Sequence, residues 1–358
     1  MQKMKTAVIG CGVISEIYLT NMTGMFDNME VVACCDLDEA KANKRSAQFG
    51  IPSRTFEEIL ADTSIELVIV LTPAPSHFGL IRQALMAGKH VYTEKTMTVE
   101  LKQAKELVEL TNEKQLYLGS APDTFLGAAI QRARQVIKEG RLGEITSFQI
   151  CSNRDLDNLT SRYTFLRLQG GGICYDYGVY YLTALVHLLG AIDSVCGVVE
   201  NRKPIRYNNV PTAADYGKEY SYPNEAQVTA VLRTKSGVTG TFTLNGESIP
   251  VDLSVFTIYG TKGVLKLANP NFFGGDIHLL KMGTDGLEDV IVENDLPYSE
   301  NSRGIGPSEM IDAIREGRPN RACKELAFHV LDTIECIMDS SITQSFKKVL
   351  SDYREDYR

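Results

Sequence analysis

A glycine-rich turn near the start of the chain has the residues needed to hold a dinucleotide. Gly10 and Gly12 lie between a short apolar run and a helical pattern, which is the setting in which such glycines bind pyrophosphate. Gly10 permits a tight turn and Gly12 lets the backbone approach the phosphates, while the amides that follow, from Val13 and Ile14 onward, donate hydrogen bonds. Ser15 replaces the usual third glycine with another small residue. The same spacing also occurs in tight turns that bind nothing.

Asp36 adds the second part of this pattern. It ends the apolar run 30–35, about 20–25 residues beyond the turn, where a carboxylate accepts hydrogen bonds from the adenosine ribose hydroxyls. A carboxylate repels a 2′-phosphate and Leu37 supplies no compensating cation, so we expect NAD, with NADP less favoured. The alternative is that Asp36 only caps a helix starting near Asp38.

Two further groups of polar residues follow apolar runs that resemble parallel strands. Thr72, Pro73 and His77 follow one run, and Glu94 and Lys95 end and follow the next. In a doubly wound sheet the carboxyl ends of the strands form the edge where ligands bind, so these residues are expected to line the cofactor site. The alternatives are a His77 that only bonds near a helix start and a surface ion pair between Glu94 and Lys95.

Hydrophobic patterning indicates the elements that position these residues. Helical stretches separate the short apolar, β-branched runs at 6–10, 30–35, 66–72, 90–94 and 116–120. Nearly continuous apolar strands between helices predict a parallel sheet covered on both faces, hence a doubly wound Rossmann domain. One helix is expected from Asp38 to Gly50, and another is expected to open at Ser76 and end at Gly88.

The pattern changes after residue 122, so we expect a Rossmann domain over 1–122 and an α+β domain over 123–358. A helix at 124–139 precedes longer strands with period-2 alternation, which predicts a large, mostly antiparallel, open sheet. One face of that sheet needs a cover, which favours a homodimer or homotetramer formed through it.

Three later segments have their own signals. The stretches 202–224 and 297–308 are rich in Pro, Asn, Tyr and Gly and have no clear period, so long loops are expected there. The segment 323–350 is helical in pattern.

The composition excludes several classes of protein. A length of 358 residues favours two domains, and 44% hydrophobic with 23% charged residues is typical of globular proteins rather than membrane or disordered ones. The net charge of -8 without a basic run argues against nucleic acid or an anionic membrane as partner, which leaves a small molecule. The N-terminus lacks a signal-peptide core, so a cytoplasmic protein is expected. The eight cysteines show no zinc spacing, so buried free thiols and no metal site are expected.

The motifs resemble those of the glucose–fructose oxidoreductase, inositol dehydrogenase and MocA family over nearly the whole chain. Residues 72–77 are similar to its TPxxxH motif, 94–96 to its EKP motif, 170–180 to its GGGxxxDxGxH motif, and 258–263 (IYGTKG) to a run of its second domain. Residues 121–127 (APDTFLG) resemble one bacterial branch without a settled substrate.

The sequence departs from the family pattern at two positions. Thr96 stands where the family usually has Pro, so the rigidity of that proline is lost. Tyr180 stands where inositol-dehydrogenase-like members have the catalytic His. Tyrosine is found at this place in other branches, including enzymes that resemble glucose–fructose oxidoreductase and dimeric dihydrodiol dehydrogenase.

The resemblance implies hydride transfer between nicotinamide and a hydroxyl or keto group of a sugar, polyol or related small molecule. Such chemistry needs an acid/base group on the oxygen and a cation that stabilises its charge. We therefore assign Tyr180 as acid/base, with its pKa lowered by the ammonium of Lys95, which also stabilises the substrate oxygen. Asp176, four residues before Tyr180 and so on the same helix face, is a partner for substrate or Lys95.

Simpler interpretations of these residues stay open. Tyr180 is flanked by Tyr177 and Tyr181 and would also suit an aromatic core, Asp176 would also cap a helix, and the glycines 170–172 would also make a flexible connection. Further candidates for the substrate pocket are Arg154, Arg162, Tyr163, Arg167 and 300–304. His187 and His329 are expected in the core or in an interface.

Two other functions fit the same motifs. One is a regulatory protein that binds NAD but has lost the chemistry, which the substitutions at Thr96 and Tyr180 favour and the retained Lys95 and Asp176 disfavour. The other is an NAD-dependent glycosidase, which oxidises its substrate transiently and regenerates the cofactor.

Overall fold

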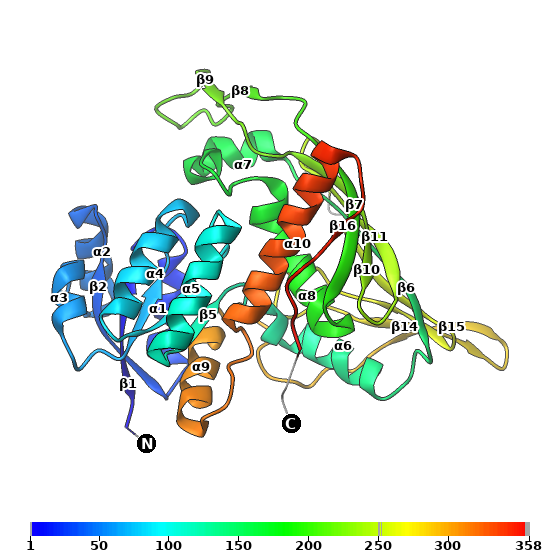
Figure 1. The fold of residues 1–358 in the computed structure, drawn as a ribbon, viewed down its shortest axis with the longest axis horizontal. Helices are drawn as coiled ribbons and strands as arrows, with labels where there is room; N and C mark the ends of the chain where they lie inside the picture. The colour runs from blue at the N-terminus through cyan, green and yellow to red at the C-terminus, as the bar shows by residue number, and fades with distance from the viewer. Residues whose placement is uncertain (1, 250, 252, 355–358) are drawn as a thin grey trace. The chain divides into compact units, whose positions relative to one another are not determined.

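The structure of the chain, a computed structural model, describes residues 2–249, 251 and 253–354 (Figure 1). Their contacts divide them into two units. The first comprises 2–123 and 301–328, and the second comprises 124–300 and 329–354. The helix α10 (Lys324–Thr343) begins among the residues of the first unit and continues among those of the second.

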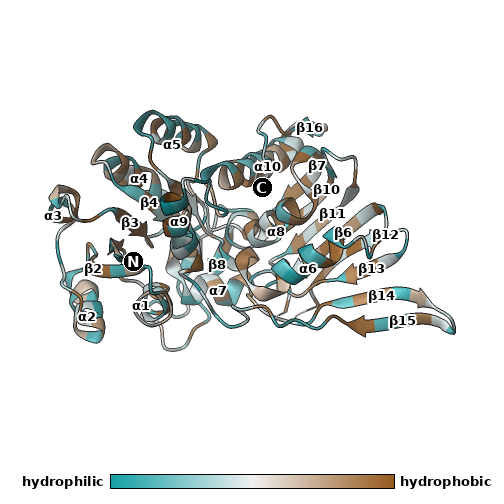
Figure 2. Cartoon of the chain, turned by 90° about the horizontal axis from the view of Figure 1, so that it is seen from below, coloured by the Kyte–Doolittle hydropathy of each residue, from teal (hydrophilic) through white to brown (hydrophobic). Residues whose placement is uncertain are grey.

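The first unit contains a parallel sheet, as expected. Its strands are β1 (Met4–Ile9), β2 (Met29–Cys35), β3 (Leu67–Val70), β4 (His90–Thr93) and β5 (Leu118–Ser120). They pair in the order β2-β1-β3-β4-β5 among the described residues. All four residues of β3 are fully buried, and Figure 2 shows this strand as hydrophobic. The order reverses at β1, so the gap between the carboxyl ends of β1 and β3 is the switch point where ligands bind in such sheets.

Helices cover both faces of this sheet. They are α1 (Ser15–Gly24), α2 (Glu39–Phe49), α3 (Phe56–Ala61), α4 (His77–Met86), α5 (Leu101–Lys114) and α9 (Ile305–Glu316). Figure 2 shows α4 and α5 on one side of the strands and α1 and α2 on the other. The Asp38 side chain accepts from the Ala40 amide and Gly50 ends α2 in the left-handed region, so both predicted boundaries are confirmed. Ser76 does not cap α4, because its hydroxyl instead donates to Thr72 Oγ1 and the Pro73 carbonyl.

The second unit contains the predicted large open sheet. Its strands are β6 (Ile145–Asn153), β7 (Ile192–Glu200), β10 (Gln227–Thr234), β11 (Thr239–Asn245), β12 (Val255–Gly260), β13 (Gly263–Lys266), β14 (His278–Gly283), β15 (Gly286–Ile291) and β16 (Lys347–Lys348). Their order is β15-β14-β13-β12-β6-β11-β10-β7-β16, and within the described part of this sheet only β6 and β11 pair in parallel. Residues of β10 alternate between buried and exposed, as the period-2 pattern predicts.

The helices of this unit are α6 (Ala128–Lys138), α7 (Leu156–Arg162), α8 (Val179–Leu189) and the later part of α10. Of these, α8 and α10 pack against the sheet, through Tyr181 on Phe256 of β12 and Ser340 on Gly197 of β7. A Cβ on Gly178 would lie 2.8 Å from Leu244 of β11, and one on Gly197 of β7 would lie 3.1 Å from Ile337 of α10. Glycine at both positions therefore lets helix and sheet approach closely.

Four expectations need correction. The segment 323–350 is not helical throughout, because α10 ends at Thr343 and the strand β16 (Lys347–Lys348) follows. The helix expected at 124–139 is broken at Gly127, where a Cβ would lie 2.6 Å from the Phe273 backbone, so a short 3-10 turn at Thr124–Leu126 precedes α6. The expected loop 202–224 contains the hairpin strands β8 (Ile205–Tyr207) and β9 (Glu219–Ser221). The expected loop 297–308 ends early because α9 begins at Ile305.

Candidate active site

The glycine turn between β1 and α1 has the geometry that a phosphate-binding turn needs. Gly10 has φ +101, and a Cβ there would lie 2.8 Å from the Leu71 carbonyl carbon at the end of β3, so only glycine fits. A Cβ on Gly12 would meet no atom within 4 Å, which leaves open space beside the turn. The residue before α1, Ile14, makes no side-chain capping hydrogen bond in the described structure. The amides from Gly12 to Ile14, just before α1, are thus suited to an anionic ligand.

The opposite side of the turn is held by a buried arginine that sequence reasoning missed. Arg45 of α2 donates from Nε to Ser15 Oγ at 3.0 Å and from Nη2 to the Gly12 carbonyl at 3.2 Å. The Ser15 hydroxyl also donates to the Gly12 carbonyl at 2.6 Å. Ser15 therefore does more than replace a glycine with a small residue, because it links the turn to α2. Arg45 lies within a helix expected only to cover the sheet, and no local signal marks it.

Asp36 joins the end of β2 to the glycine turn. Its Oδ2 accepts from the Cys11 amide at 2.7 Å, and its Oδ1 accepts from the Asp38 amide at 2.9 Å. Asp38, not Asp36, caps α2, so the capping alternative for Asp36 is wrong. An ionised carboxylate has about four acceptor sites, so these two bonds leave capacity for ribose hydroxyls. Leu37 is fully exposed beside it.

His77 connects the loops that follow β3 and β4. Its Nδ1 lies 2.7 Å from the Thr96 carbonyl oxygen, and its Nε2 lies 2.7 Å from the Thr72 carbonyl oxygen. The ring is fully buried, and this burial lowers the pKa of His77. His77, the first residue of α4, thus links the two predicted ligand loops to each other.

Glu94 and Lys95 lie at the carboxyl end of β4. Glu94 is buried; its Oε1 accepts from the Tyr18 hydroxyl at 2.8 Å and its Oε2 from the Lys95 amide at 3.1 Å. The Lys95–Thr96 peptide bond is cis. The hydroxyls of Thr93 and Thr96 are buried and have no hydrogen-bond partner among the described residues. Lys95 and these polar groups therefore share the edge of the sheet where the glycine turn lies.

Asp123 is a buried acid that sequence reasoning did not assign. Its Oδ2 accepts from the Gly304 amide at 3.2 Å and the Gly306 amide at 3.1 Å, so it serves the amides at the start of α9. Burial is the main cause that raises the pKa of Asp123 to about 6, and the negative charge of Glu94 adds to the shift. Residues 301–303 also attach to the first unit, because Asn21 of α1 donates to the Asn301 and Arg303 carbonyls.

The second unit holds the other two predicted catalytic residues, Asp176 and Tyr180. Asp176 lies in a π-helical turn, Cys174–Gly178, and Tyr180 lies in the first turn of α8. The four-residue spacing therefore crosses a junction between two helix types, which corrects the expected single α-helical face. The Asp176 amide donates to the Gly172 carbonyl at 2.8 Å, and its side chain does not occupy the capping position. Tyr180 is 8% exposed.

The tyrosines beside Tyr180 are fixed by polar contacts of their own. Tyr177 Oη receives hydrogen bonds from Asn269 Nδ2 at 2.9 Å and Ser152 Oγ at 3.3 Å, and it lies 3.2 Å from Tyr181 Oη. The Arg154 guanidinium lies 4.3 Å from the centre of the Tyr177 ring. Arg154 thus supports the packing next to Tyr180.

The other pocket candidates of this unit differ in environment. Arg167 donates to Asp215 Oδ2 at 3.0 Å and to the Thr160 carbonyl at 2.8 Å, and its guanidinium stacks 3.7 Å above the Tyr220 ring. These bonds assign it a structural role within the unit. Arg162 and Tyr163 are exposed at the end of α7.

The two histidines expected in the core or in an interface lie in the core. His187 and His329 are buried, and His329 accepts from the Ile192 amide at its Nε2 at 2.8 Å. All eight cysteines are free thiols; Cys151, Cys196 and Cys336 are only half-buried, which corrects the expectation for those three.

Within the described ranges, no group of three or more His, Cys, Asp or Glu side chains is arranged to hold a metal ion. No helix among the described residues is both long and apolar enough to cross a bilayer.

Two family profiles match consecutive parts of this chain. Residues 4–121 match the oxidoreductase family with an NAD-binding Rossmann fold, and residues 130–266 match the C-terminal domain of the same Gfo/Idh/MocA family. The chain belongs to this family. The resemblance noted in the motifs is confirmed, as is the predicted combination of a Rossmann domain and a second, mostly antiparallel domain.

Three individual proteins that resemble this chain share between 19% and 30% sequence identity with it over the aligned residues. An uncharacterised oxidoreductase of Schizosaccharomyces pombe is 30% identical over 211 residues, which are 57% of this chain and 57% of that protein. The trans-1,2-dihydrobenzene-1,2-diol dehydrogenase of Bos taurus is 27% identical over 272 residues, 75% of each chain. A levoglucosan dehydrogenase in complex with NADH has the same fold, with a TM-score of 0.85 at 19% identity over 98% of this chain and 100% of that one.

Proposed function

We propose that this Gfo/Idh/MocA oxidoreductase transfers a hydride between NAD and a hydroxyl or keto carbon of a small sugar, polyol or cyclic diol. The observation that carries the proposal is the glycine turn, where only a glycine fits at position 10 and the space beside Gly12 is open. The name of the Bos taurus relative, a dehydrogenase of a cyclic diol, supports the substrate class.

Several groups of the first unit suit the dinucleotide. The uncapped start of α1 would bind the pyrophosphate through the amides from Gly12 to Ile14, and Asp36 would accept from the ribose hydroxyls. The residues after β3 and β4 that form the rest of the proposed cofactor site are Thr72, Pro73, His77, Glu94 and Lys95. The negative charge of Asp36 and the neutral, exposed Leu37 favour NAD over NADP.

The proposed chemistry divides between three side chains. Bound NAD would supply the hydride acceptor. Tyr180, in place of the histidine found in inositol-dehydrogenase-like members, would take the proton of the substrate hydroxyl on its phenolic oxygen. Lys95 would stabilise the negative charge on the substrate oxygen, and Asp176 would accept a hydrogen bond from a substrate hydroxyl.

The exposed face of the large sheet supports a homodimer or homotetramer. Val198 of β7 and Val231 of β10 are 60% and 45% exposed, and Val198 pairs with Thr229 across the strands. An exposed apolar face on a sheet marks a surface that can contact another protein chain. Light scattering on the purified protein would measure the assembly, and a monomer at all concentrations would refute it.

The proposed activity is tested by nicotinamide absorbance with a panel of sugars, inositols and cyclic diols. At least one compound should reduce NAD, and Lys95→Met should lower kcat about 100-fold because the substrate oxygen loses its cation. The exposed Lys105→Met is the matched control and should leave kcat unchanged. NAD binding without reduction by any compound would favour the regulatory alternative, and release of nitrophenol from a glycoside without net NADH would favour the glycosidase.

A further inference from the structure

A carboxylate of the second unit binds the start of the helix that carries the proposed catalytic side chains. Glu225, just before β10, accepts from the Cys174 amide at 2.9 Å and the Tyr175 amide at 3.4 Å through Oε1. Its backbone carbonyl accepts from the Ile173 amide at 3.0 Å. One residue thus satisfies three consecutive amides at a helix N-terminus, where a negative charge is also favoured by the helix dipole.

Gly171 and Gly172, just before this helix, leave room for these contacts because they have no side chain. A Cβ on Gly172 would lie 1.9–2.1 Å from the carboxyl atoms of Glu225, and a Cβ on Gly171 would lie 2.1 Å from the Leu166 carbonyl oxygen. The Gly171 carbonyl in turn accepts from the Tyr222 hydroxyl at 3.0 Å. Gly171 and Gly172 are therefore closely packed and do not form the flexible connection that their composition also allowed.

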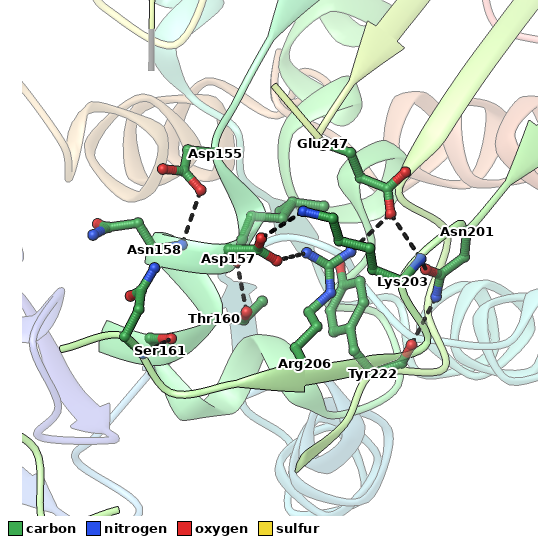
Figure 3. A network of polar contacts seen from close by, with 12 residues as sticks. Asp155, Asp157, Asn158, Thr160, Ser161, Asn201, Lys203, Arg206, Tyr222 and Glu247 are labelled. Carbon is green, nitrogen blue, oxygen red and sulfur yellow. Dashed lines mark hydrogen bonds and ion pairs between the residues drawn. The ribbon is translucent and has the colours of Figure 1, made fainter. Parts of the chain in front are cut away.

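A polar network holds Tyr222 beside these glycines. The Arg206 guanidinium lies 4.4 Å from the centre of the Tyr222 ring and pairs with Asp157 and Glu247 (Figure 3). Arg206 is 2% exposed, so these charge pairs are protected from solvent. The network fixes Tyr222, and through it the position of the Gly171 carbonyl.

We propose that Glu225 is a positioning residue, whose carboxylate fixes the π-helical turn Cys174–Gly178 and thereby the placement of Asp176 and Tyr180 for hydride transfer. The catalytic part of this inference rests on the proposed function. Asp176 lies within the turn, one residue after the second amide that Glu225 binds, and Tyr180 follows one turn later. Displacement of the first amides would therefore shift the positions of both side chains together.

The hold of Glu225 depends on its charge. Although the residue keeps some exposure, its carboxyl group is enclosed, and this burial, with the charge of Asp176 added, raises the pKa of Glu225 to about 7. The other titratable groups that interact with it are Cys174, Tyr175 and Tyr222, all neutral at this pH. The Cys174 and Tyr175 amides lower the pKa of this enclosed carboxyl. Protonation therefore favours an opening of the turn in which the amides withdraw while the carboxyl stays enclosed, so the turn should loosen as the pH falls below about 7.

Amide hydrogen exchange tests this hold without any need for substrate. In the wild-type protein, exchange of amides 173–175, corrected for the intrinsic effect of pH, should be several-fold faster at pH 6 than at pH 8. In Glu225→Gln the exchange should be fast at both pH values, whereas the exposed Glu293→Gln should behave as wild type. Equal protection at pH 6 and pH 8 in the wild-type protein would overturn the charge-dependent hold, even if the variant does not fold.

Turnover tests the catalytic part separately. Glu225→Gln should lower kcat about tenfold with an unchanged KM for NAD, and it should lose the fall in kcat that the wild type shows below about pH 7. Wild-type kcat and pH profile in the variant would overturn the positioning role. If the exchange results hold but the wild-type protein turns over no compound, the proposed function fails while the hold of Glu225 on the turn stands.

Discussion

Two glycine-rich turns precede helices in this molecule, one in each unit. The helix that follows the first turn has no side-chain cap in the described part of the chain, whereas the helix that follows the second is capped by a carboxylate. Before α1, Ile14 makes no side-chain capping bond in the described structure, and the space beside Gly12 is open. Before the Cys174–Gly178 turn, the space beside Gly172 is filled by the carboxylate of Glu225. Similar glycine letters thus produce one turn suited to an external anion and one already occupied by the protein's own anion.

This difference suits the first turn to binding a ligand and the second to positioning side chains of its own helix. A helix start that lacks its cap leaves orphan amides, which a phosphate can satisfy. A helix start capped from a distant segment instead fixes the side chains of its first turns. Asp123, which accepts from the Gly304 and Gly306 amides at the start of α9, is a second case of such capping, in the first unit.

The largest expected effect is at the open turn. Gly10→Ala places a Cβ 2.8 Å from the Leu71 carbonyl carbon at a residue with φ +101, so NAD affinity measured by calorimetry should fall more than about 100-fold. Gly24→Ala at the end of α1 is the control, because a Cβ there meets no atom within 4 Å. Unchanged affinity in Gly10→Ala would mean that this turn does not hold the cofactor.

The matching change in the occupied turn should separate the two roles. Gly172→Ala would put its Cβ onto the Glu225 carboxylate, so kcat should fall about 50-fold while NAD affinity stays within about twofold of the wild type. Gly24→Ala is the control here as well, because its Cβ meets no atom within 4 Å and its φ does not lie in the left-handed region. Equal losses of NAD affinity in Gly172→Ala and Gly10→Ala would erase the distinction between the turns.

The sequence is sufficient for features that depend on local pattern. The strands β1 to β5, the Asp38 cap and the place of Lys95 at a strand end follow from apolar runs and capping residues. The break at Gly127 does not, because its cause is contact with Phe273 in a distant loop. Glu225 is missed for the same reason, since nothing near it in sequence identifies the amides that it binds.

A smaller effect is expected from exchange of the ribose-binding carboxylate. Asp36→Ser combined with Leu37→Arg removes the negative charge and adds a cation, so the ratio of NADP to NAD affinity should rise about tenfold or more. Exposed Asp285→Ser is the control for the loss of one surface charge. A ratio equal to the wild-type ratio would show that Asp36 only ties the Cys11 amide to β2.

The smallest effect concerns stability. Because the pKa of Asp123 is raised to about 6 in the folded state, its contribution to stability is full below the unfolded pKa and is lost as the pH rises through about 6. Asp123→Asn removes this dependence, so the loss in unfolding free energy between pH 5 and pH 7.5 should be about 1 kcal/mol smaller than in the wild type. Urea denaturation followed by circular dichroism measures it, and identical losses would contradict the shifted pKa.

The division of labour between the two turns is tested most directly by Tyr180→Phe, with NADH formation and NAD affinity measured on the same preparation. Loss of the phenolic oxygen should lower kcat about 100-fold or more with a substrate that the wild type oxidises, while NAD affinity is unchanged. Wild-type turnover in this variant would contradict the account, because the occupied turn would then position no catalytic group at Tyr180.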